Sequence, residues 1–82
     1  MPTLRQLEYL VALADLRHFG RAAQASHVSQ PSLSQQVRAL EQRLGLELVE
    51  RNQTRVELTP IGRDIAERAR AILVAVEDVR EV

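Results

Sequence analysis

Uncharged hydrogen-bonding side chains gather in one short stretch of the chain, around a Ser-Gln-Pro-Ser element. Residues 29–38 hold three serines, three glutamines and one arginine, and they lack acidic residues. Glutamine can pair bidentately with adenine, arginine with guanine, and serine can donate or accept at either base. This is the chemistry of reading base edges. We find no nucleophile beside a base, no glycine-rich phosphate loop and no paired catalytic carboxylates, so the sequence predicts a binding protein and not an enzyme.

A helix from Ser29 to Gly45 would place these polar side chains on one exposed face. Ser29 suits the N-cap, Pro31 falls in the first turn, where a missing N–H is harmless, and Gly45 suits the C′ position. The apolar residues recur at helical spacing and form one stripe: Leu33, Val37, Leu40 and Leu44. The helix start and the opposite face carry the candidate DNA-contacting residues: Ser29, Gln30, Pro31, Ser32, Ser34, Gln35 and Arg38.

This polar face also has an ordinary interpretation, because any surface helix exposes one to solvent. Solvated helix faces usually favour glutamate and lysine, however, whereas this face is rich in glutamine and serine. We therefore favour contact with bases or phosphates. On the same helix, Arg38 and Glu41 are spaced for a local ion pair.

Two helices are expected before this one. Thr3 and Gln6 fit a capping box at the start of a helix over about residues 4–17. A short alanine-rich helix over residues 20–26 follows, and residues 27–28 make a turn. A short helix, a tight turn and a helix with a polar outer face are typical of a helix-turn-helix, whose second helix enters the major groove of DNA.

A small β-hairpin is predicted after the third helix. Residues 46–51 and 56–58 show partial alternation of apolar and polar side chains, and residues 52–55 lie between them. Arg51 and Arg55 flank the hairpin tip, and arginine on such a wing can enter the minor groove or clamp the phosphate backbone. The alternative is an ordinary hairpin whose charges only keep it soluble.

One long helix is predicted from the Thr59-Pro60 start signal to the end of the chain, about 23 residues and about 34 Å long. From Ile65 onward its apolar positions have the spacing of two packed helices, and Leu73 widens the stripe. The candidate dimerisation residues are Ile61, Ile65, Ala69, Ile72, Leu73, Val76 and Val79. A single small domain cannot cover so long a stripe, so we expect a second copy of the helix to cover it in a homodimer. The alternative is that the helix packs back on its own domain.

The expected fold is mainly α. Residues 1–58 would form a winged helix-turn-helix domain with a small β-hairpin wing, and residues 59–82 a long C-terminal linker and dimerisation helix. Cysteine is absent and the two histidines lack a second ligand type at metal spacing, so we expect no disulfide, metal or cofactor. The net charge is zero, but residues 17–43 have four arginines against Glu41 alone, which favours an anionic partner at that end.

Several runs of residues match one family of regulators: Leu4–Leu10, Phe19–Ala23, Val28–Ser34, Leu40-Glu41, Leu44-Gly45, Leu48–Arg51 and Leu58–Gly62. On these runs, the chain resembles the N-terminal DNA-binding domain of LysR-type transcriptional regulators over nearly its whole length. The resemblance implies a domain that binds double-stranded DNA and a linker helix that dimerises antiparallel with its mate. It also implies a C-terminal effector domain that is absent from this chain, and a dimer of dimers for the full-length protein.

Carried over residue by residue, the family's DNA contacts fall on Gln30, Pro31, Ser32, Ser34 and Gln35 in the recognition helix, and on Arg51 in the wing. The chain departs from the family pattern in two places. Many members have arginine where this chain has Gln35. The arginine that often follows Arg51 by three residues is Thr54 here, so either the adjacent Arg55 takes over the minor-groove role or the wing is shifted. Residues 7–19 look most like the peroxide-sensing branch.

A rival function from another class is a helical protein-interaction module whose polar third helix binds a partner protein and not DNA. The chain lacks an apolar run of the ~20 residues that a membrane span needs and a signal peptide at its start. We therefore expect no membrane association, and the family resemblance implies a cytoplasmic location beside the bacterial nucleoid.

Overall fold

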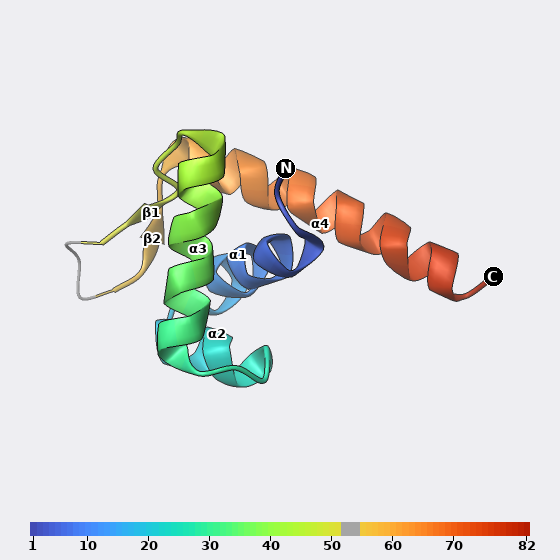
Figure 1. Cartoon of the computed structure of the whole chain (residues 1–82), viewed down its shortest axis with the longest axis horizontal. Coiled ribbons are helices and arrows are strands. Elements are labelled where there is room, and N and C mark those ends of the chain that lie inside the picture. The colour runs from blue at the N-terminus through green and yellow to red at the C-terminus, as the bar shows by residue number, and fades with distance from the viewer. Residues whose placement is uncertain (52–54) are drawn as a thin grey trace.

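The computed structural model describes residues 1–51 and 55–82. Its elements follow the chain in this order: α1 (Leu4–Leu16), α2 (Phe19–Ala25), α3 (Gln30–Leu44), β1 (Val49–Glu50), β2 (Glu57–Leu58) and α4 (Pro60–Arg80). Figure 1 shows α1 packed between α3 and α4, the two strands beside α3, and α4 running away from the body to the C-terminus. The predicted order of helices and strands is confirmed.

α1 begins at the capping box that the sequence predicts. The Thr3 hydroxyl accepts a hydrogen bond from the Gln6 N–H, and the Gln6 side-chain oxygen accepts one from the Thr3 N–H, both at 3.1 Å. Gln6 is buried, and its Nε2 donates to Gln36 Oε1 at 3.2 Å, which ties α1 to α3. The helix ends one residue earlier than predicted, because Arg17 caps it in a left-handed conformation with φ 53°.

The helix-turn-helix consists of α2, a tight turn and α3. The Nδ1 atom of His18 accepts a hydrogen bond from the Arg21 N–H at 3.0 Å, so α2 begins one residue earlier than predicted. In the turn, His27 adopts a left-handed φ of 57°, and the Val28 N–H donates to the Ala23 carbonyl at 3.0 Å. Both histidines therefore shape the backbone at the two ends of α2.

α3 is capped at both ends by the predicted residues. The Ser29 hydroxyl accepts a hydrogen bond from the Ser32 N–H at 3.2 Å, and Gly45 ends the helix with a left-handed φ of 67°. The predicted apolar stripe lies in the core, with three fully buried members and one half-buried member at the helix end: Leu33, Val37, Leu40 and Leu44. The opposite face of α3 must therefore point away from the body.

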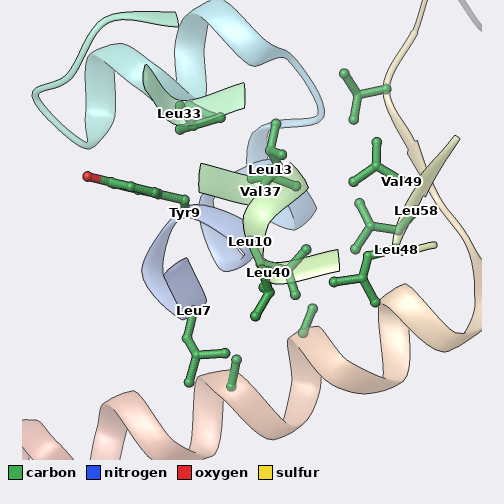
Figure 2. Packing of buried hydrophobic residues seen from close by; sticks show 14 of the residues in the cluster. Leu7, Tyr9, Leu10, Leu13, Leu33, Val37, Leu40, Leu48, Val49 and Leu58 are labelled. Carbon is green, nitrogen blue, oxygen red and sulfur yellow. The ribbon is translucent and has the colours of Figure 1, made fainter. Parts of the chain in front are cut away.

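The core lies where α1, α3 and the hairpin meet. Figure 2 shows apolar side chains from these elements pointing toward one another, and the largest fully buried ones are Leu10, Leu13, Leu33, Val37, Leu40, Leu48 and Val49. Burial of apolar surface stabilises the folded state by about 25 cal/mol per Å². The packing of this cluster is therefore the main interaction that holds α3 against α1.

The wing is a shorter hairpin than the sequence predicts. β1 and β2 pair antiparallel over two residues each, with Val49 opposite Leu58 and Glu50 opposite Glu57. Residues 46–48 lie outside the strand, and the Leu48 N–H donates to the Glu41 carboxylate. Of the predicted turn, residues 52–54 lie outside the described part of the chain.

α4 begins at the predicted signal, since the Thr59 hydroxyl accepts a hydrogen bond from the Gly62 N–H at 3.0 Å and Pro60 is the first helical residue. The helix ends at Arg80, two residues before the expected end. Its first half packs on α1, whereas its second half extends past the body, which gives the molecule its long axis of 43 Å (Figure 1).

Candidate nucleic-acid interface

The polar face of α3 is open to solvent. Ser34 is half-buried, and the other candidate contacts on this helix are exposed: Ser29, Gln30, Pro31, Ser32, Gln35 and Arg38. The Ser29 and Ser32 hydroxyls hydrogen bond to each other at 2.9 Å at the helix start. Within residues 1–51 and 55–82, the side chains of Gln30, Gln35 and Arg38 have no intramolecular hydrogen bond. Their donors and acceptors are therefore available to a ligand such as a base edge.

Gln36 has a different role from Gln35. Its side-chain oxygen accepts the hydrogen bond from buried Gln6, so this glutamine braces α3 against α1. The neighbouring Gln35 is exposed and, within the described residues, its side chain makes no hydrogen bond, so it is the glutamine that can read a base. Helical periodicity separates the two residues correctly, because consecutive residues are about 100° apart around a helix.

Arg21 belongs to the same surface, although we did not single it out from the sequence. This exposed residue of α2 lines an open hollow together with Gln30 from α3 and Arg55 from the wing. Two other charged residues of the hollow are already paired, Asp15 with Arg70 and Arg17 with Glu57. The hollow therefore presents Arg21 and Arg55 between the start of α2 and the wing, where a phosphate backbone could lie. Only the three-dimensional meeting of α2, α3 and the wing reveals it.

The two wing arginines differ in their surroundings. Arg51 is 27% exposed and pairs with the Glu41 carboxylate, whereas Arg55 is exposed and, within the part of the chain that the structure describes, makes no ion pair. The prediction that Glu41 pairs with Arg38 is wrong, because the Glu41 side chain turns toward β1 and binds Arg51. Within the described ranges, the Arg38 guanidinium consequently has no ion pair on the polar face.

The long apolar stripe of α4 divides into two faces. Gly62, Ala66 and Ala69 are buried against the body, and Leu73 lies half-buried on the same side. Ala69 is only 1% exposed, so it faces its own core and is unavailable to a partner helix. Ile65 and Val76 are half-buried, and Ile65 packs against the core.

A second apolar face of α4 remains uncovered. Ile61, Ile72 and Val79 are 38%, 44% and 73% exposed. At about 100° per residue they fall within ~20° of one another around the helix axis, beside the buried small residues. The part of α4 that could meet a second copy is therefore narrower than the predicted stripe.

An ion pair links α4 to α1 where the helix leaves the body. The guanidinium of Arg70 donates to both carboxylate oxygens of Asp15 on α1, at 2.8 and 3.2 Å. This hydrogen bonding by Asp15 raises the pKa of Arg70 above its ordinary value. The contact lies near the middle of α4, where the packed half of the helix gives way to the free half.

Other kinds of site are not found in the described residues. No group of three or more His, Cys, Asp or Glu side chains there could hold a metal ion. None of the helices in those ranges combines the length and the apolar character that crossing a bilayer requires.

A short helix, a tight turn, an outward-facing second helix and a two-stranded hairpin beside it define a winged helix-turn-helix domain. The family model described as "Bacterial regulatory helix-turn-helix protein, lysR family" matches residues 4–63. The chain belongs to this family, as its motifs predicted.

Among curated proteins, the chain is 51% identical over 79 residues to the hydrogen peroxide-inducible genes activator of Pectobacterium carotovorum subsp. carotovorum, which covers 96% of the chain and 26% of that protein. It is 49% identical over 79 residues to the DNA-binding transcriptional dual regulator OxyR of Escherichia coli K12, with the same coverage of 96% and 26%. The expected likeness to the peroxide-sensing branch is confirmed. The chain spans about a quarter of the length of these relatives.

Solved structures agree with this assignment. A full-length OxyR variant from Pseudomonas aeruginosa superposes with a TM-score of 0.93 at 47% identity, covering 96% of the chain and 27% of that protein. The BenM DNA-binding domain, solved with benA site 1 DNA, superposes with a TM-score of 0.92 at 35% identity, covering 96% of the chain and 89% of that one. The chain is therefore a DNA-binding domain of the kind that transcription regulators carry.

Proposed function

We propose that this chain binds double-stranded DNA sequence-specifically as a homodimer and serves transcriptional regulation. One observation carries the proposal: Gln35 and Arg38 lie exposed on the outer face of α3 and Gln30 at its start, with their hydrogen-bonding groups unused within the described residues. Donors and acceptors in such a row match base edges in the major groove, where each base pair shows its own pattern.

The arrangement around α3 suggests which part of the DNA each group of residues would contact. The N-terminal half of α3 would lie in the major groove, with Pro31 offering an apolar edge to a thymine methyl. The Ser29 hydroxyl and the first N–H groups of α3 would hold a phosphate. Arg21 in the hollow would contact the backbone, and the wing arginines would lie at the adjacent minor groove.

The BenM domain that superposes on this chain was solved with DNA, as was the Vibrio fischeri DarR protein, which superposes with a TM-score of 0.90 at 34% identity. Both likenesses cover α3 and the wing, since each spans 96% of the chain. These relatives support double-stranded DNA as the partner and weigh against the rival function, a protein-interaction module.

For the homodimer, we propose a contact between α4 helices. Ile61, Ile72 and Val79 form the uncovered face that a second copy could bury. We keep the division into residues 1–58 for DNA recognition and 59–82 for linkage and dimerisation. Within it, the first half of α4 also completes the core of the recognition domain. In a longer protein with an effector domain, two such dimers would form a tetramer. We expect the protein to be located in the cytoplasm, beside the nucleoid.

Selection from a pool of random 40-base-pair duplexes tests the proposal. The 82-residue chain should enrich two half-sites related by dyad symmetry, with centres separated by whole turns of DNA, about 10–10.5 base pairs each. Bound duplexes that share no sequence would reject specific recognition. A pool from which nothing is retained would favour the protein-interaction alternative.

A further inference from the structure

We infer that Glu41 is a positioning residue for DNA recognition. It holds the wing against α3 through Arg51 and the start of β1, and it leaves Arg55 as the wing's DNA-contacting arginine. This role rests on the proposed DNA-binding function and names the device that sets the wing beside the recognition helix.

The Glu41 carboxylate is a junction for three donors. Its Oε2 accepts hydrogen bonds from the Leu48 N–H at 2.8 Å and the Val49 N–H at 3.2 Å, and its Oε1 accepts one from the Arg51 guanidinium. The Glu41 side chain is only 13% exposed. Charge-assisted hydrogen bonds that are shielded from water are stronger than ordinary ones, so this junction binds β1 firmly to the C-terminal half of α3.

The wing needs such support because its own pairing is weak. Each strand has two residues, and an isolated two-stranded hairpin is marginal in water. Glu50 and Glu57 also face each other across the register, a like-charge pair that weakens the hairpin further. Two ion pairs to the body compensate: Glu41 holds Arg51 after β1, and Arg17 holds Glu57 on β2.

Residues 47–48, just before β1, also hold the start of α4. The Leu48 carbonyl accepts a hydrogen bond from the Thr59 N–H at 3.0 Å, while the Leu48 N–H is held by Glu41. The Thr59 hydroxyl in turn donates to the Glu47 carbonyl at 2.7 Å. A displacement at Glu41 would therefore move the wing relative to α3 at the point where the wing joins α4.

This arrangement separates the roles of the two arginines. The Arg51 guanidinium is committed to Glu41 and mostly covered, whereas Arg55 is exposed and lines the basic hollow with Arg21. Within residues 1–51 and 55–82, Arg55 has no ion pair to give up when it reaches a groove or a phosphate.

Replacing Glu41 by glutamine distinguishes a positioning role of Glu41 from direct DNA contact by Arg51, because the two predict opposite changes in DNA affinity. Glu41→Gln removes a negative charge near polyanionic DNA, which by itself favours binding. If Arg51 contacts DNA directly, this change also frees its guanidinium, and affinity should rise. If Glu41 positions the wing, the NH₂ group that replaces one acceptor oxygen leaves either Arg51 or the β1 N–H groups without a partner, the hold on the wing weakens, and affinity should fall.

The test uses the 82-residue chain and a duplex enriched by the selection above, with affinity measured by fluorescence anisotropy at one fixed salt concentration. We expect Glu41→Gln to raise Kd about tenfold, the size of one lost DNA contact. Glu47→Gln is the matched control, because it removes the same charge as Glu41→Gln. Glu47 is exposed and lines the same surface hollow as Glu41. Its Kd should stay equal or fall.

Hydroxyl-radical footprinting supplies a readout that a general loss of fold would not give. Glu41→Gln should lose backbone protection at the outer flanks, where the wing lies, and keep it over the half-site centres. Arg51→Gln leaves the β1 N–H groups bonded to Glu41 and should show the same pattern more weakly. Arg55→Gln should lose the flank protection without lowering the melting temperature.

An unchanged or lower Kd for Glu41→Gln would overturn the positioning role, as would full flank protection with Arg55→Gln. Circular dichroism must show wild-type helicity for each variant. If Glu41→Gln fails to fold, Arg51→Gln decides, since wild-type flank protection in that variant would also overturn the role. Failure of the wild-type chain to bind any duplex would instead reject the proposed function.

Discussion

Gln35 is the side chain on α3 from which sequence preference is most directly testable. Contacts to phosphates position a protein but carry no sequence information, whereas contacts to base edges do. Gln35 is exposed, and its neighbour Gln36 is occupied by Gln6, so the two adjacent glutamines offer an internal comparison.

Gln35→Ala should weaken binding to a selected site by about 1–3 kcal/mol per half-site and leave binding to random DNA nearly unchanged, because a base contact and not a phosphate contact is lost. Competition titrations with both DNAs measure the difference. Gln42→Ala is the control, since Gln42 is also exposed on α3 but lies about 10 Å further along the helix axis. Equal losses on both DNAs would remove Gln35 from base recognition.

Gly62 and Gly45, on either side of the wing, disfavour a side chain for different reasons. A Cβ on Gly62 would lie 2.1 Å from the Leu48 carbonyl oxygen, which is backbone and cannot move aside. A Cβ on Gly45 would meet nothing within 4 Å, so only its left-handed φ of 67° opposes a side chain there. Gly62 therefore sets how closely α4 approaches the start of β1.

Gly62→Ala should destabilise the domain by about 3 kcal/mol or more, because the backbone must shift to relieve the overlap. Gly45→Ala should cost only about 1–2 kcal/mol, the usual penalty of a left-handed residue. Thermal denaturation followed by circular dichroism measures both. A Gly62→Ala variant as stable as Gly45→Ala would contradict the close approach of α4.

The free half of α4 offers a matched pair for testing the homodimer. Ile72 and Val74 are 44% and 58% exposed, and about 200° of helix rotation separates them. Ile72→Asp should raise the dimer dissociation constant at least about 100-fold, because it would place an unpaired charge in the contact. Val74→Asp should leave it unchanged. Sedimentation equilibrium decides, and equal behaviour of the two variants would reject this face.

The sequence predicts those parts of the elements that depend on neighbouring residues. Ser29, Gly45 and Thr59 mark helix ends correctly, because caps are local hydrogen bonds and local backbone conformations. The partner of Glu41 was missed, since Arg51 lies ten residues away and reaches it only through the fold. Helical periodicity identified the apolar residues of α4. It could not tell which of them pack on the core and which remain exposed for a partner, because both groups recur at helical spacing.

The overall charge of the chain hides an asymmetry that matters for DNA binding. The net charge is zero, yet Arg21, Arg38 and Arg55 lie unpaired around α3 and the wing, within the ranges that the structure describes. The far end of α4 is acidic, with Glu77, Asp78 and Glu81 against Arg80. A long axis of 43 Å separates these ends, so the chain would approach DNA with its basic end first.

The direction of α4 links recognition to dimerisation. The Asp15–Arg70 pair and the buried small residues of α4 hold the packed half of the helix, so the free half projects at a fixed angle. In the proposed homodimer, this angle would set the separation of the two α3 helices and hence the spacing of the half-sites.

Dimethyl sulfate protection on a selected duplex tests most directly whether the polar face of α3 reads base edges. The reagent methylates guanine N7 in the major groove and adenine N3 in the minor groove, so it reports which groove each part of the protein occupies. We expect the 82-residue chain to protect guanine N7 at the centre of each half-site, and adenine N3 only at the flanks beside the wing. Fully reactive guanines at the half-site centres, in a duplex that the chain demonstrably occupies, would contradict the central claim.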